Sequence, residues 1–183
     1  MSFEVGADDD LDCVERCLRG ETAAFRPLVE RYQRLLFTVA LRMLGDREQA
    51  ADAAQTAFVR AYLKLQTFDR GHKFFSWLYR ILVNECLNLR RAAGRFEPLG
   101  ATLAAREDPA AGLEQQELRE AVQAALLRLP SAQREAVVLR HYGGLSYHEM
   151  AEVLHVPEKT IKSRLYSARQ RLGELLLGWG GRR

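Results

Sequence analysis

Cysteine is scarce in this sequence, and long apolar runs are missing. The 183 residues include only three cysteines, Cys13, Cys17 and Cys86, an odd number that forms no disulfide framework and agrees with a reducing cytoplasm. No apolar run approaches the roughly 20 residues needed to span a bilayer. The chain begins with acidic residues, whereas a secretory signal begins with positive charge. We therefore expect a cytoplasmic protein that is not embedded in a membrane.

Motifs of the common enzyme classes are also missing. The chain has no P-loop, no dinucleotide-binding fingerprint and no nucleophile elbow. His141, His148 and His155 recur every seven residues, so no two of them form the i, i+4 pair of a helical metal site. Cys13 and Cys17 would share one helix face, but two thiolates without a nearby histidine make a poor metal site, and small buried side chains are the simpler interpretation. We predict that the protein is not an enzyme and has no catalytic residue, metal or cofactor.

Charge is distributed unevenly, although the formal net charge is only +3. Five acidic residues lie among the first twelve. From residue 158 onward, seven basic residues stand against only two acidic ones, Glu158 and Glu174. A basic segment of this kind indicates an anionic partner such as nucleic acid.

Helical periodicity dominates the first half of the chain. Apolar residues recur at spacings of three and four from Phe25 to Leu44, which predicts one amphipathic helix. Gly45 can end that helix in a left-handed conformation, and Asp46 can cap a second one that runs to about Leu65. A third helix is expected from about Phe74 to Arg91.

Residues 92–112 interrupt this pattern with three glycines and two prolines among alanines and charged residues. We interpret this segment as a flexible linker. The predicted fold is therefore all-α, with two small helical domains at 1–91 and 113–183.

The second domain is predicted to contain four helices, of which the last two form a helix-turn-helix. The first helix ends before Pro130, and Ser131 is expected to cap the next. Ser146 and Glu149 fit a capping box before a short helix that ends near Leu154. A tight turn then leads to a longer basic helix, which is the layout of a helix-turn-helix. His155 occupies a turn position where glycine is common, so we expect slight backbone strain there.

The exposed face of the last helix carries side chains suited to DNA. Charge alone would fit an ordinary solvated helix, but the capping box, the tight turn and the basic face occur together, which favours DNA binding. Some of these side chains would contact base edges in the major groove, and the flanking ones would hold phosphates. The candidate residues are Lys159, Thr160, Lys162, Ser163, Arg164, Tyr166, Ser167, Arg169, Gln170 and Arg171.

Several motifs together identify a family. The run Asp52-Ala-Ala-Gln55-Thr-Ala-Phe58, the run Phe74-Phe-Ser-Trp-Leu-Tyr-Arg-Ile81 and Asn84 resemble region two of bacterial sigma factors. Leu129-Pro130, Arg134 and the helix-turn-helix resemble region four. The chain therefore resembles the extracytoplasmic-function (ECF) sigma factors, from about residue 23 to residue 176.

The resemblance implies a mechanism. Such proteins join core RNA polymerase and direct it to promoters, and the C-terminal helix-turn-helix reads the minus-thirty-five element. The resemblance places the polymerase contact at Asp46, Glu48, Asp52 and Gln55, where acidic side chains would meet basic ones. Thr56 stands where relatives usually carry an acid, which leaves one contact weaker or absent.

The same resemblance assigns the opening of the minus-ten element to the loop at 68–73 and the helix after it. Stacking on aromatic rings can stabilise unstacked bases by roughly 1–3 kcal/mol per base, and cations can add contacts to the backbone. The candidate residues are Phe68, His72, Lys73, Phe74, Arg80, Asn84, Arg90 and Arg91. Two of them have a second interpretation, since Phe74 equally fits the core and Asn84 equally fits a cap for internal polar groups. Trp77, Leu78 and Ile81 are expected in the core.

Promoter DNA and core polymerase are thus the expected partners, with an anti-sigma factor implied by the resemblance. The alternative is a one-component helix-turn-helix regulator, whose other domain would bind a ligand or a dimer partner. The aromatic and basic segment from Phe68 to Arg91 favours the sigma factor.

Overall fold

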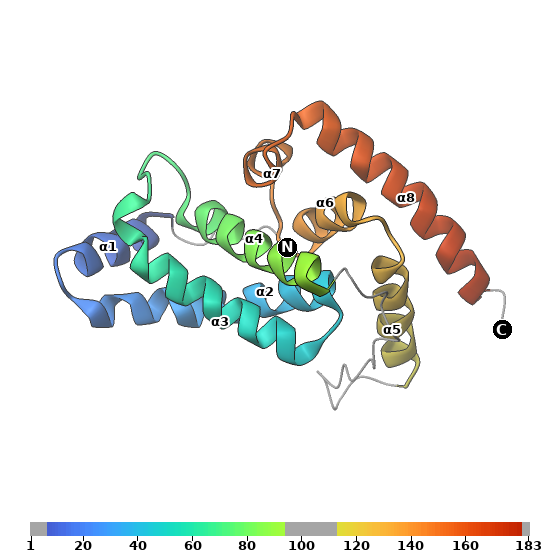
Figure 1. Ribbon diagram of the computed structural model, residues 1–183, viewed down its shortest axis with the longest axis horizontal. Coiled ribbons are helices and arrows are strands. Elements are labelled where there is room, and N and C mark those ends of the chain that lie inside the picture. Colours follow the sequence, from blue (N-terminus) through green and yellow to red (C-terminus); the bar gives the residue numbers. More distant parts are fainter. Residues whose placement is uncertain (1–6, 94–112, 181–183) are drawn as a thin grey trace.

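A computed structural model describes residues 7–93 and 113–180, and every regular element in these two ranges is a helix (Figure 1). The N-terminal half contains α1 (Ala7–Leu18), the 3-10 turn η1 (Thr22–Phe25), α2 (Arg26–Leu44), α3 (Arg47–Leu63), the 3-10 turn η2 (Leu65–Thr67) and α4 (Phe74–Ala93). The C-terminal half contains α5 (Leu113–Leu127), α6 (Ser131–His141), α7 (Tyr147–Leu154) and α8 (Glu158–Gly180). The all-α prediction is confirmed, and most of the predicted linker lies outside the described residues.

The N-terminal core forms where α2, α3 and α4 pack on one another. The inward face of α3 is almost entirely alanine, which lets the neighbouring helices approach closely; Ala50, Ala53, Ala54, Ala57 and Ala61 are all buried. The α1 helix is attached by a buried carboxylate, because Asp10 accepts hydrogen bonds from the Tyr32 hydroxyl and the Arg31 guanidinium. Burial raises the pKa of Asp10, although both hydrogen bonds and the charge of Arg31 oppose that shift.

The turn between α2 and α3 has the predicted chemistry. Gly45 ends α2 with φ +78°, in the left-handed region that favours glycine, and its N–H donates to Leu41 O. The Asp46 carboxylate then accepts from the Gln49 N–H at 2.8 Å and caps α3. The sequence thus fixes this corner of the domain by local rules.

Local signals also shape the C-terminal half. Ser146 and Glu149 form the complete capping box at the start of α7. His155 follows α7 with φ 52° and ψ 45°, and this left-handed conformation confirms the strained turn. The prediction that Ser131 caps α6 is wrong, because Ser131 is already helical. Pro130 is the N-cap instead: its backbone is extended, and its carbonyl accepts a hydrogen bond from the Gln133 N–H.

The two halves pack directly against each other. One continuous cluster of buried side chains runs from α4 into α6 and α7, and it joins Tyr79 and Leu82 to Leu139 and Met150. At a second contact, a Cβ added to Gly45 would lie 2.7 Å from Leu127 Cδ1, so α2 and α5 meet closely. In Figure 1, α4 lies alongside α7, and α2 lies beside α5.

None of the helices in the described ranges is long and apolar enough to cross a membrane. Within the same residues, no group of histidine, cysteine and acidic side chains is arranged to hold a metal ion. All three cysteines are buried and free, and burial raises the pKa of each thiol.

Candidate nucleic-acid and polymerase interfaces

The helix-turn-helix consists of α7, the turn at 155–157 and α8. Its inner surface is apolar, and Met150, Val153, Ile161 and Ala168 are all buried. These contacts fix the rotation of α8 about its axis, so the opposite face of α8 is turned to solvent.

That outer face carries the predicted minus-thirty-five residues. Tyr166 is 66% exposed, and its hydroxyl accepts a hydrogen bond from Gln170 Nε2 at 3.0 Å. Only Thr160 and Arg164 are half-buried, and the remaining eight candidates are exposed: Lys159, Lys162, Ser163, Tyr166, Ser167, Arg169, Gln170 and Arg171. The structure therefore presents cations, hydroxyls and an amide along one helical face, as groove readout requires.

Sequence reasoning missed a neighbouring residue, Tyr147. Its ring lies near two cations, with the Arg140 guanidinium 5.1 Å and the Lys162 ammonium 5.9 Å from the ring centroid. The ring therefore links α6 and α7 to the recognition face of α8 through cation–π contacts. The available signal was an aromatic residue directly after the Ser146 cap, at the exposed start of α7.

The aromatic rings of the segment predicted to contact the minus-ten element are buried and not exposed for stacking with bases. Phe68 is 7% and Phe74 only 2% exposed, and their centroids lie 5.6 Å apart in an edge-to-face contact. Trp77 packs on both rings at 5.3 and 5.8 Å. The expectation that Phe68 and Phe74 offer free faces to bases is therefore wrong for this conformation, because the rings close the core beneath the loop. Phe74 is a core residue.

The polar members of the same set lie at the surface. His72, Lys73, Asn84 and Arg91 are exposed, and Arg80 and Arg90 are half-buried. The exposure of Asn84 disfavours a role in capping internal polar groups.

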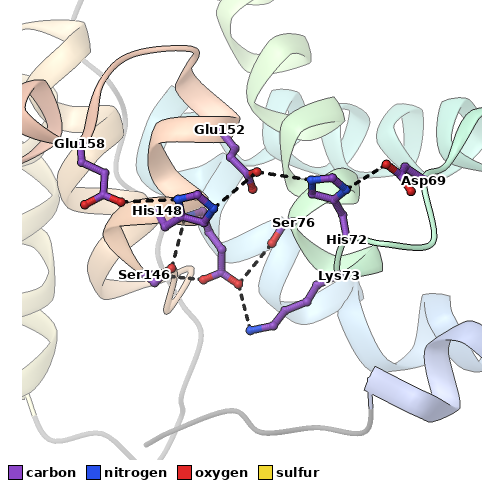
Figure 2. Close-up of polar contacts among 9 residues, drawn as sticks. Asp69, His72, Lys73, Ser76, Ser146, His148, Glu152 and Glu158 are labelled. Atoms are coloured by element: carbon purple, nitrogen blue, oxygen red, sulfur yellow. Dashed lines mark hydrogen bonds and ion pairs between the residues drawn. The ribbon is translucent and has the colours of Figure 1, made fainter.

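Acidic residues of α7 lie against the start of α4 (Figure 2). Lys73 Nζ is 3.0 Å from a Glu149 carboxylate oxygen, and His72 Nε2 is 3.4 Å from Glu152. Burial raises the pKa of Glu149, but hydrogen bonds from Ser146 and Lys73 outweigh it, and the net pKa is lowered. Glu149 is thus held as a carboxylate beside the proposed strand-binding segment.

The four predicted polymerase contacts lie together on the exposed surface of α3 and its cap. Asp46, Glu48, Asp52 and Gln55 are all exposed. Beside them runs an apolar groove between α2 and α3, lined by Phe37, Ala54, Gln55, Phe58 and others. Sequence reasoning missed this groove. Val59, which lines it and is 52% exposed, is an apolar residue off the buried stripe that could have indicated it.

The arrangement of these surfaces defines a promoter-binding protein with a capped helix-turn-helix. The Sigma-70 region 2 model matches residues 28–96, and the Sigma-70, region 4 model matches residues 119–172. The chain is 33% identical to the RNA polymerase sigma-H factor of Pseudomonas aeruginosa, across 92% of this chain and 94% of that one. It is 31% identical to the ECF RNA polymerase sigma factor SigW of Bacillus subtilis, across 89% and 94% of the two chains.

Solved structures agree with these sequence relatives. CnrH in complex with the cytosolic domain of CnrY superposes with a TM-score of 0.73 at 28% identity, covering 94% of this chain and 98% of that one. The sigma factor RpoE in complex with the anti-sigma factor NepR, from Bartonella quintana, gives a TM-score of 0.72 at 29% identity, covering 83% and 96%. The chain belongs to the ECF sigma factors. It is a sigma factor that directs promoter-specific transcription initiation with RNA polymerase.

Proposed function

We propose a division of labour among three surfaces of this sigma factor. The exposed face of α8 reads the minus-thirty-five element, the polar residues around the start and outer side of α4 hold the minus-ten strand, and the outer face of α3 binds core polymerase. The observation that carries the proposal is the rotation of α8, which exposes eight of the ten predicted contacts while Ile161 and Ala168 remain buried.

The minus-ten assignment is narrower than the sequence alone suggested. We assign strand contacts to His72, Lys73, Arg80, Asn84 and the pair Arg90 and Arg91, since cations can hold the sugar-phosphate backbone. Phe68 and Phe74 support this surface from beneath.

Polymerase binding is assigned to Asp46, Glu48, Asp52 and Gln55 together with the apolar groove beside them. Exposed carboxylates steer a basic partner, and an adjacent apolar groove adds burial that charge alone does not supply. The protein itself acts by binding, and the chemistry of RNA synthesis belongs to the polymerase. We propose that it works in the cytoplasm, with the chromosome and the polymerase.

An anti-sigma factor is a further proposed partner. The two structural relatives described above were solved with CnrY and NepR, and NepR is an anti-sigma factor. The similarity in fold supports a regulator of the same kind for this chain.

In vitro transcription tests the assignment. The purified protein and core polymerase are incubated with a library of genomic fragments, and transcript starts are sequenced. New starts that share two upstream motifs are expected. A one-component regulator would instead bind its duplex site without core enzyme and yield no dependent transcript.

Two variants separate the surfaces. Lys162→Ala combined with Ser163→Ala should impair minus-thirty-five recognition, by about tenfold or more if each contact contributes ~1 kcal/mol, while polymerase binding is retained. Asp52→Arg should lose polymerase in a pull-down while the fold is kept. If both variants lose both activities with unchanged circular dichroism, the proposed division is wrong.

A further inference from the structure

We propose that Tyr147 is a positioning residue for promoter recognition: its ring holds the side chain of Lys162 in the orientation that reads a guanine of the minus-thirty-five element. This inference rests on the proposed function, because it needs the outer face of α8 to read that element. It deepens that function by adding a residue of α7, outside the recognition helix and outside the ten predicted contacts, that sets how precisely the base is read.

The contact crosses the helix-turn-helix. Tyr147 is the first residue of α7, and Lys162 lies in the second turn of α8. Lys162 Nζ lies 5.9 Å from the centroid of the Tyr147 ring, within the ~6 Å over which an aromatic face attracts a cation. The tyrosine is 38% exposed, so its ring reaches the surface beside the exposed face of α8.

In the described ranges, no acidic side chain forms an ion pair with Lys162. Glu158, one turn earlier on α8, is at the spacing that ordinarily pairs with a lysine, but its carboxylate lies 3.5 Å from His148 Nδ1 instead. A carboxylate on Lys162 would have to be displaced by DNA and would repel its phosphates. An aromatic ring orients the ammonium group and leaves its charge available.

The ring itself is held in place by groups of the same domain. The Arg140 guanidinium, on α6, lies 5.1 Å from the ring centroid, and its Nη1 donates to Leu145 O at 2.8 Å. Leu145 is fully buried, so the guanidinium is anchored to the core. The Ser146 capping box fixes the backbone at the start of α7, directly before Tyr147. The fold therefore sets the orientation of the ring before DNA binds.

Such prior orientation matters for a lysine, because its four-carbon stem has many rotamers to lose. A lysine that is already oriented loses less conformational entropy on binding. In the major groove the acceptors that suit it are O6 and N7 of guanine. A lysine without this support can settle on a phosphate, which carries no sequence information. Loss of the Tyr147 ring should therefore reduce base discrimination more than it reduces overall DNA binding.

A direct contact of Tyr147 with DNA is the competing role, because a tyrosine hydroxyl can donate to a phosphate. Tyr147→Phe removes the hydroxyl and keeps the aromatic face, whereas Tyr147→Leu removes both. A positioning role predicts that only the leucine variant is impaired. A direct hydroxyl contact predicts that both variants are impaired equally. Because Tyr147 is partly exposed, both variants should keep wild-type helicity by circular dichroism.

The test uses the full-length protein with core polymerase on a promoter mapped by the transcription experiment above. Each base pair of the minus-thirty-five element is replaced in turn, and the ratio of transcript from the original and altered promoters gives the discrimination at that position. Lys162→Met locates the guanine that Lys162 reads, where discrimination should fall about fivefold or more. Tyr147→Leu should lower discrimination at the same position by about two- to fivefold, and Tyr147→Phe should match wild type.

A double-mutant cycle separates positioning from a general structural effect. In the Lys162→Met background, Tyr147→Leu should cause no further loss of discrimination, because the side chain that the ring orients is already gone. A loss of the same size in both backgrounds would overturn the positioning role. Equal discrimination by Tyr147→Leu and wild type, or equal impairment of the phenylalanine and leucine variants, would overturn it as well.

A failure of the proposed function looks different. In that case Lys162→Met would leave discrimination unchanged at every position of the minus-thirty-five element, whatever the Tyr147 variants do.

Discussion

Arg134 should be one of the residues on which the stability of the protein depends most. Its guanidinium is buried and donates to Leu126 O at 2.8 Å, Met43 O at 3.0 Å and Leu129 O at 3.2 Å, and also to Leu127 O. Three of these carbonyls lie at the end of α5 or just beyond it, and one of them, Leu126 O, also accepts the Leu129 N–H at 3.1 Å. The fourth ends α2 in the other half of the chain.

The magnitude follows from what Arg134→Leu leaves behind. Four carbonyls lose the Arg134 donor, but Leu126 O keeps the Leu129 N–H, so three are left unpaired; at ~1 kcal/mol each the loss is about 3 kcal/mol. Burial of the guanidinium and the nearby charge of Arg90 lower the pKa of Arg134 to about 10, which shows that its desolvation offsets part of the gain. We expect a decrease of about 2–4 kcal/mol in the free energy of unfolding, because buried carbonyls are left without a donor.

Urea-induced unfolding followed by far-UV circular dichroism measures this loss. Arg171→Leu, an exposed position on α8, is the control and should change stability by no more than about 0.5 kcal/mol. A loss below about 1 kcal/mol for Arg134→Leu would mean that the carbonyls find other partners, and the assigned role would be wrong.

Three further predictions concern single positions. His155→Gly should raise the free energy of unfolding by about 0.5–1 kcal/mol. Glycine adopts the left-handed backbone without strain, and this gain exceeds the extra entropy that glycine gives the unfolded chain. A loss of stability would contradict this. Gly45→Ala should lower it by about 1–3 kcal/mol, because the new Cβ would lie 2.7 Å from Leu127 at φ +78°, and an unchanged urea midpoint would refute the contact. The pKa of Glu149 is lowered in the folded protein from its ordinary value of 4.5. The ionised Glu149 carboxylate therefore stabilises the fold above pH 4.5, and this stabilisation is lost as the pH falls through the folded pKa. The difference in thermal midpoint between wild type and Glu149→Gln should be full at neutral pH and vanish in acid.

The helices were predictable because their signals are local. Apolar spacing, the glycine at position 45 and the capping residues at 46 and 146 act within a few residues of themselves, and each has its expected geometry. The helix-turn-helix was predictable for the same reason, including the left-handed His155.

It was harder to predict from the sequence which side chains are exposed on the proposed minus-ten surface. Phe68 and Phe74 fall at spacings that suit either the core or an exposed aromatic platform, and only packing against Trp77 decides between them. The apolar groove between α2 and α3 was hard to predict for a related reason, because an exposed valine is common on any surface.

The contact between the two halves left no trace in the sequence. Lys73 and Glu149, like Arg134 and Met43, are separated by more than seventy residues, and periodicity carries no information about such pairs. The sequence therefore predicted two helical units and was silent on how they meet.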